Sequence, residues 1–238
     1  MRLAIETATD RASVALGTSA VDAVEREIVG ARRHAAELLP AIARLLRDAG
    51  LELADVTGLI VSDGPGSFTG LRVGATVAKA LARARGLPVW TAPSLLVRAS
   101  GIARPDDTVL AVANALRGEV YAAAYRFDVA AIHELLPPSV YRPEVLLARA
   151  PRVDHLVGEV PAPVVHLLEQ GLGRTLVAPP AGAPHARMLL GLVARPGGAV
   201  QIAAVESWEP AYGRPAEAQA RWETAHGRAL PDSIGSPG

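Results

Sequence analysis

The stretch Ser62–Gly74, with the sequence SDGPGSFTGLRVG, decides how this chain is interpreted. An apolar run, Leu59-Ile60-Val61, precedes it and predicts a strand, and an apolar-periodic helix follows it. A strand, a glycine-rich turn and a helix N-terminus together offer backbone N–H groups to an anion. The same residues also suit a tight structural turn, in which Pro65 fixes φ and the glycines adopt conformations that other residues avoid.

The spacing in this turn fits no established ligand motif. Gly64, Gly66 and Gly70 read G-x-G-x-x-x-G, whereas a dinucleotide fingerprint reads G-x-G-x-x-G. A P-loop ends in Gly-Lys-Ser/Thr, and here Leu71 follows Gly70. A nucleophile elbow needs G-x-S-x-G, which is also absent. The position is typical of a phosphate site, but the pattern leaves the turn's role open.

The composition bounds the class of protein. Half of the 238 residues are apolar, and 24 basic residues balance 24 acidic ones. A neutral chain offers no overall field for nucleic acid or an acidic membrane. The absence of cysteine excludes disulfides and thiolate chemistry. No apolar run approaches the ~20 residues of a membrane span. Charged residues occur too early in the first segment for it to be a signal peptide. We therefore expect a cytoplasmic protein with no membrane contact.

The first part of the chain predicts a mixed sheet with helices on its faces. Periodicity and turn residues place the elements. The expected strands cover 2–7, 12–17, 20–29, 56–62 and 88–90, and the expected helices cover 32–49, 69–85 and 93–102.

The pattern restarts near residue 107. Strands are expected at 108–113, 119–127, 132–136 and 153–158, and helices at 143–150, 184–195 and 215–226. The second part therefore resembles a smaller, irregular version of the first. We predict a domain over 1–104, a smaller one over 105–205, a C-terminal helical segment over 206–228 that packs back on the first domain, and a disordered tail over 229–238.

Two further groups of residues have more than one interpretation. Glu6 and Thr7, at the end of the first strand, suit a metal or phosphate site, or ordinary turn hydrogen bonds. No two of the six histidines lie within five residues of each other, so a local histidine metal site is not expected. His34, at a helix start, suits a capping or solvated role.

The helix after the turn carries a strip of small residues. Gly70, Gly74, Ala78 and Ala82 are four residues apart and therefore share one face. Such a strip allows another helix to approach closely. It predicts either close packing inside the same domain or an interface with another chain, and the spacing alone does not choose between them.

Taken together, the motifs resemble the TsaB (YeaZ) family of tRNA threonylcarbamoyladenosine biosynthesis proteins. Gly64–Gly74 closely resembles the family's glycine-rich signature. In chain order, Ile5–Thr9 resembles its opening hairpin, His34–Pro40 its H-S-E-x-L-L-P helix start, Asn114–Tyr121 its D-A-R-x-G-E-V-Y segment and Glu209–Arg214 its closing E-P-x-Y-x-R. The likeness is strong over 1–125 and thin over 128–205.

The resemblance implies an α/β protein with an actin-like (ASKHA) fold of two ribonuclease-H-like mixed-sheet domains. It implies a non-catalytic subunit that pairs with the catalytic subunit TsaD through the helices at 32–49 and 69–85. TsaE would join them, and the complex transfers a threonylcarbamoyl group to N6 of an adenosine in tRNA. ATP and metal are expected on TsaD, tRNA contact only through the complex, and a homodimer when TsaD is absent.

The chain also departs from the family pattern. Glu6 and Ala8 replace Asp and Ser, and Asn114 and Leu116 replace Asp and Arg. These changes remove or move groups that bind phosphate or metal in a catalytic relative. We therefore assign no catalytic or metal-ligating residue, and keep an ATP-dependent phosphotransferase and a peptidase as alternatives. The predicted partner interface comprises His34, Leu38, Ile42, Phe68, Gly70, Leu71, Arg72, Gly74 and Ala78. The predicted vestigial phosphate turn comprises Glu6, Thr7, Gly64, Gly66 and Ser67.

Overall fold

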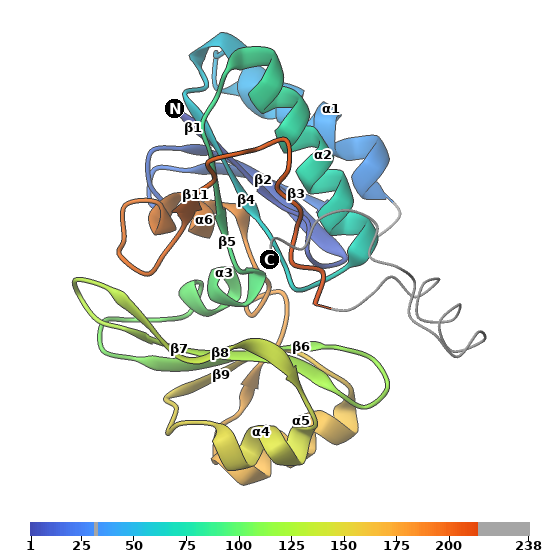
Figure 1. Cartoon of the computed structure of the whole chain (residues 1–238), viewed down its shortest axis with the longest axis vertical. Coiled ribbons are helices and arrows are strands. Elements are labelled where there is room, and N and C mark those ends of the chain that lie inside the picture. Colours follow the sequence, from blue (N-terminus) through green and yellow to red (C-terminus); the bar gives the residue numbers. More distant parts are fainter. Residues whose placement is uncertain (31–32, 214–238) are drawn as a thin grey trace.

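The computed structural model describes residues 1–30 and 33–213, which form two mixed sheets with helices between and around them (Figure 1). The first sheet consists of β1 (Arg2–Glu6), β2 (Arg11–Gly17), β3 (Val24–Val29), β4 (Gly58–Ser62), β5 (Val89–Ala92) and β11 (Val200–Gln201). Its strand order is β11-β5-β4-β1-β2-β3. β1 pairs antiparallel with β2 and parallel with β4, which brings the β1–β2 turn next to the end of β4.

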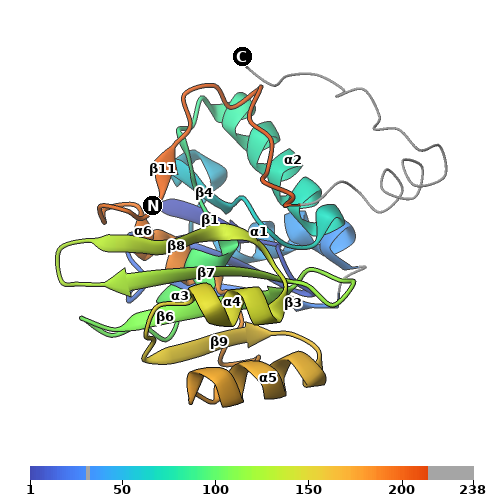
Figure 2. The same ribbon diagram turned by 60° about the horizontal axis from the view of Figure 1, so that its bottom comes forward.

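The second sheet has the order β10-β9-β6-β7-β8. Its strands are β6 (Thr108–Asn114), β7 (Val120–Phe127), β8 (Ile132–Tyr141), β9 (His155–Glu159) and β10 (Leu176–Val177). Figure 2 turns this sheet toward the viewer and shows its four longer strands side by side. As in the first sheet, an antiparallel hairpin lies beside a parallel strand, β9 against β6.

The helices occupy three layers. α1 (His34–Asp48) and α2 (Phe68–Arg85) pack on the outer face of the first sheet, with a short 3₁₀ turn at Leu53–Asp55. α3 (Ser94–Ser100) and α6 (Ala186–Leu192) lie between the sheets. α4 (Pro143–Arg149) and α5 (Ala162–Leu172) cover the outer face of the second sheet.

The central strands of both sheets are buried on both faces. On β1, Leu3 and Ile5 pack toward α1 and α2, while Ala4 faces the layer between the sheets. On β7, Ala122 packs toward α4 and α5, and Tyr121 faces inward. Burial on two faces explains why these central strands are near-continuous apolar runs, whereas the edge strands β3 and β8 carry exposed polar residues.

The expected elements of the first part are present, with ends shifted by a few residues. Among later elements, β8 continues to Tyr141, through Pro137 and Pro138, which an edge strand tolerates because its outer N–H groups need no partner. α5, β10 and β11 were not predicted. β10 and β11 have only two residues each, too few to show the two-residue alternation of a strand.

The sequence-based division differs from the packing in the second part. α6 packs on β1, β2 and β4, and β11 pairs with β5, although both elements fall within 105–205. The chain therefore returns to the first sheet before residue 205. The helix predicted at 215–226 and the tail at 229–238 lie outside the described residues.

Candidate functional site

The glycine-rich turn is pressed against neighbouring backbone. A β-carbon on Gly66 would lie 2.3 Å from the Ala8 carbonyl oxygen, and one on Gly70 would lie 2.1 Å from the Thr7 carbonyl oxygen. Gly64 has φ +104°, and its β-carbon would lie 2.3 Å from the Ala211 carbonyl oxygen. These contacts require glycine at each position, because any side chain would displace the main chain it touches.

The backbone donors at this turn bond to the chain itself. The Ser67 N–H donates to the Ala8 carbonyl at 2.7 Å, the Gly70 N–H to the Ser67 side-chain oxygen at 3.2 Å and the Leu71 N–H to the Ser67 carbonyl at 2.8 Å. Ser67 thus acts as the N-cap of α2. The predicted phosphate turn is formed, but its Ser67 and Gly70 donors serve intramolecular bonds.

Glu6, at the end of β1, is fully buried beside this turn. Its Oε1 accepts the Ala8 N–H at 2.7 Å. Burial raises the pKa of Glu6 to about 7, against the opposing effects of that bond, of Ser62 and of the positive charges of Arg98 and His185. Glu6 Oε2, Thr7 Oγ1 and Ser62 Oγ have no hydrogen-bond partner among the described residues. A carboxylate at this point is unfavourable for a neighbouring phosphate.

Residues Glu209–Gly213, the C-terminal strap, cross the glycine-rich turn. The Ala211 N–H donates to the Asp63 carbonyl at 2.7 Å, and the Tyr212 ring lies 4.6 Å from that of Phe68. Glu209 forms a 2.8 Å salt bridge with Lys79 of α2. The E-P-x-Y part of the closing motif therefore holds the strap over the turn. Arg214 lies outside the described residues.

The predicted partner interface needs correction on α2. Gly70, Leu71, Gly74 and Ala78 are buried within the chain. A β-carbon on Gly74 would lie 2.4 Å from Thr7 Oγ1, so the strip of small residues admits the β1–β2 turn rather than another helix. Of the alternatives that the spacing left open, the structure shows close packing inside the same domain.

The predicted interface residues of α1 are also buried. His34, Leu38 and Ile42 face the first sheet, and His34 Nε2 has no hydrogen-bond partner among the described residues. Phe68, partly buried, contacts Tyr212 and lies 5.1 Å from the guanidinium of Arg72, which is exposed. Of the predicted set, Phe68 and Arg72 remain accessible.

The two outer helices expose a different set of residues, which we call the outer helix face. It consists of Ala36, Leu39, Pro40 and Ala43 of α1 with Thr76 and Ala80 of α2. Leu39 is 53% exposed, which is unusual for a leucine at the centre of an apolar helix segment. Because each residue advances by about 100° round a helix, Leu39 lies well to one side of the face that His34, Leu38 and Ile42 share. That offset is the sequence signal that could have identified Leu39 as exposed.

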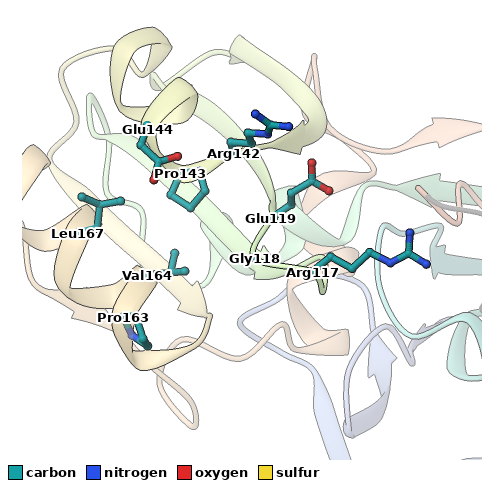
Figure 3. Close-up of a pocket in the computed structure, with 9 residues that line it drawn as sticks. All are labelled: Arg117, Gly118, Glu119, Arg142, Pro143, Glu144, Pro163, Val164 and Leu167. Carbon is teal, nitrogen blue, oxygen red and sulfur yellow. The ribbon is translucent and has the colours of Figure 1, made fainter.

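A pocket of about 510 Å³ lies between the β6–β7 loop, the start of α4 and α5 (Figure 3). Arg142, Pro143 and Glu144 line it at the start of α4, and Val164 and Leu167 of α5 form its apolar side. Arg117, from the β6–β7 loop, extends away from those two apolar side chains. A specific ligand site requires polar groups that converge on one point. The charged groups of this pocket do not converge in that way.

Two properties of the described residues limit the chemistry of the chain. Within residues 1–30 and 33–213, no cluster of three or more histidine or acidic side chains could hold a metal ion. No helix of the same residues is long and apolar enough to cross a membrane.

Known proteins match the chain in sequence and in structure. The family described as "TsaD: tRNA N6-adenosine threonylcarbamoyltransferase" matches residues 27–170. The tRNA threonylcarbamoyladenosine biosynthesis protein TsaB of Escherichia coli is 36% identical over 160 residues, 66% of this chain and 68% of that protein. TsaB of Bacillus subtilis is 31% identical over 106 residues, 44% of this chain and 46% of that protein.

Among solved structures, YeaZ from Pseudomonas aeruginosa has a TM-score of 0.69 at 29% identity, covering 89% of this chain and all of that one. A second Pseudomonas aeruginosa structure, described as having similarity to peptidase YEAZ, also scores 0.69 at 30% identity and covers 90% of this chain. Two stacked mixed sheets, with a glycine-rich turn packed on the first hairpin, define an actin-like (ASKHA) α/β protein. The chain belongs to the TsaD family and, within it, to the TsaB-like (YeaZ-like) proteins.

Proposed function

We propose that this chain is a non-catalytic subunit in the biosynthesis of N6-threonylcarbamoyladenosine in tRNA, paired with a TsaD-like catalytic subunit. Membership in the family and the names of its Escherichia coli and Bacillus subtilis relatives support the pathway. A TsaE-like ATPase would join the pair, and tRNA would be reached only through the complex. The tRNA modification would take place in the cytoplasm.

One observation carries the subunit role: the outer helix face exposes Leu39, whereas the Ser67 and Gly70 N–H groups of the glycine-rich turn are bonded within the chain. Ala36, Leu39, Pro40 and Ala43 are exposed uncharged residues of α1, and the exposed Arg44 follows them. Helix pairs from two chains supply standard interfaces of ~1,600 Å² in total. We place the TsaD-like partner here rather than on the buried strip of α2. In its absence the same face would pair two copies of this chain.

The turn's geometry supports the absence of a nucleotide or metal on this chain alone. Ala8 accepts the Ser67 N–H that a phosphate would need, and the strap covers Gly64 from the other side. ATP and metal would therefore belong to the TsaD-like partner. Calorimetry of the isolated chain with Mg-ATP is expected to give no binding heat. Saturable binding would instead favour the phosphotransferase alternative.

The peptidase alternative has one finding in its favour, the likeness of this chain to a structure with similarity to peptidase YEAZ. Against it, the described residues contain no metal-ligand cluster, and the turn lacks the G-x-S-x-G elbow. The purified chain is expected to leave casein intact. Turnover of casein that persists through repeated purification would contradict the non-catalytic role.

The proposed interface with the TsaD-like subunit is tested by replacing one exposed leucine by arginine and comparing it with the same replacement at a second exposed leucine. Leu39→Arg places a charge in the outer helix face and is expected to abolish co-purification with the TsaD-like subunit, since an unpaired charge opposes burial. Leu116→Arg is the matched control, because Leu116 is 60% exposed but lies on the β6–β7 loop. Equal co-purification of both variants and the wild type would rule out this face.

A further inference from the structure

A second pocket, of about 330 Å³, opens between the two sheets. The glycine-rich turn supplies Asp63 and Pro65, and Pro93 follows β5. Tyr121 of β7 and Pro138 of β8 form the opposite wall, and the C-terminal strap closes one side. The volume falls in the range of small-molecule sites, and the walls are mostly apolar.

Asp63 is the only charged side chain among the described residues that line this pocket. Burial raises its pKa to about 6, against a hydrogen bond from the Thr91 side chain. No salt bridge between Asp63 and a described lysine, arginine or histidine is present. At neutral pH the carboxylate is therefore largely ionised, with its charge uncompensated by those groups. Asp63 is partly buried, and charges withdrawn from water in proteins are normally paired.

Tyr125 of β7 does not line the pocket but lies within the electrostatic reach of Asp63. Its side chain is 2% exposed, yet its hydroxyl has no hydrogen-bond partner among the described residues. Burial, together with the negative charges of Glu134 and Asp63, raises the pKa of Tyr125. The Tyr125 hydroxyl thus lacks a hydrogen-bond partner, and Asp63 lacks a cationic one, among the described residues.

We propose that this pocket binds an organic cation, an alkylammonium or guanidinium group, with its charged head at Asp63 and its stem against the prolines and Tyr121. Basic stems pack well on apolar walls while the head meets a carboxylate. The Tyr121 ring adds an attractive face for a cation. A hard metal ion fits poorly, because it needs six or more oxygen ligands and the pocket offers one carboxylate. An anion is excluded by the charge of Asp63.

The test titrates the full chain with butylammonium and with butylguanidinium and follows backbone amide signals by NMR. Asp63, Gly64 and Gly213 should shift and saturate, whereas 1-butanol, the neutral control, should leave them unchanged. Asp63→Asn keeps the shape but removes the charge, and is expected to weaken binding at least about tenfold. Binding of butanol as strong as that of the cations, or unchanged affinity in Asp63→Asn, would overturn the proposal.

Wild-type protein gives a second measurement that needs no variant. Because only the ionised carboxylate attracts a cation, affinity should fall as pH is lowered through about 6. Affinity for butylguanidinium that is constant across that range would also overturn the proposal. Adding the TsaD-like subunit to the complex with the probe then identifies the natural source of the cation. Displacement of the probe indicates a basic side chain of the partner, and simultaneous binding indicates a free amine. Both outcomes uphold the cation site, which does not depend on the proposed function.

Discussion

Gly74 of α2 lies so close to Thr7 that a β-carbon on the glycine would be 2.4 Å from Thr7 Oγ1. This contact fixes the distance between α2 and the β1–β2 turn. It also explains why the helix accepts glycine in its first half, at a cost of roughly 1 kcal/mol in helix propensity.

Gly74→Ala is therefore expected to lower the free energy of unfolding by up to about 2 kcal/mol, which is an overpacking cost of about 1–3 kcal/mol less a helix-propensity gain of about 1 kcal/mol. In a Thr7→Ala background the obstructing oxygen is gone, so the same substitution should become neutral or stabilising. Gly70→Ala is the control, because its β-carbon would meet the Thr7 backbone oxygen at 2.1 Å, which Thr7→Ala leaves in place. Urea denaturation of the double-mutant cycle measures the coupling. Equal costs for Gly74→Ala in both backgrounds would contradict the contact.

Glu6 should make stability depend on pH. Its pKa is raised from 4.5 to about 7 in the folded state, so the folded chain holds the proton more tightly than the unfolded chain. The free energy of unfolding should then fall by about 3 kcal/mol as pH rises from 4.5 to 7 and level off above that. Glu6→Gln should remove this part of the pH dependence of the free energy of unfolding, measured by urea denaturation at each pH. A smaller fall, due to Asp63, should remain. An unchanged slope would show that Glu6 ionises normally.

The strap should depend on the ring contact between Tyr212 and Phe68. Tyr212→Ala removes that contact, and we expect faster amide hydrogen exchange at Ala211, whose N–H bonds to Asp63. Tyr212→Phe keeps the ring and should retain wild-type protection. Exchange that is equal in all three proteins would mean that the strap is held by Lys79 and Glu209 instead.

The β6–β7 loop contains two residues in the left-handed region that are not glycine, Leu116 at φ 62° and Arg117 at φ 52°. Leucine pays a steric penalty in this conformation that asparagine avoids in part. Because the Leu116 side chain is largely exposed, Leu116→Asn should raise the free energy of unfolding by ~1 kcal/mol, read from the urea midpoint. A lower midpoint would indicate that Leu116 makes a stabilising contact.

Sequence patterns identified the elements best where the apolar periodicity and the residues that end a helix or strand agree. Leu38, Ile42 and Leu45 repeat on one face of α1, and Gly86 stops α2 in the left-handed conformation, so both helices were placed within two residues. α5 was missed although Gly173 ends it in the same way. The Pro161-Ala162-Pro163 start obscured it, since prolines at the first turn of a helix also suit a loop.

The sequence by itself determined the family and the actin-like fold, because the glycine-rich stretch, the opening hairpin and the closing E-P-x-Y occur in the right order. Only the tertiary structure decided what the glycines do. A four-residue spacing reveals a strip of small side chains but not what lies against it. That neighbour is the β1–β2 turn, which reaches α2 because β1 pairs with both β2 and β4. The same packing leaves Leu39 exposed and Asp63 at the base of a pocket, and neither result follows from local sequence.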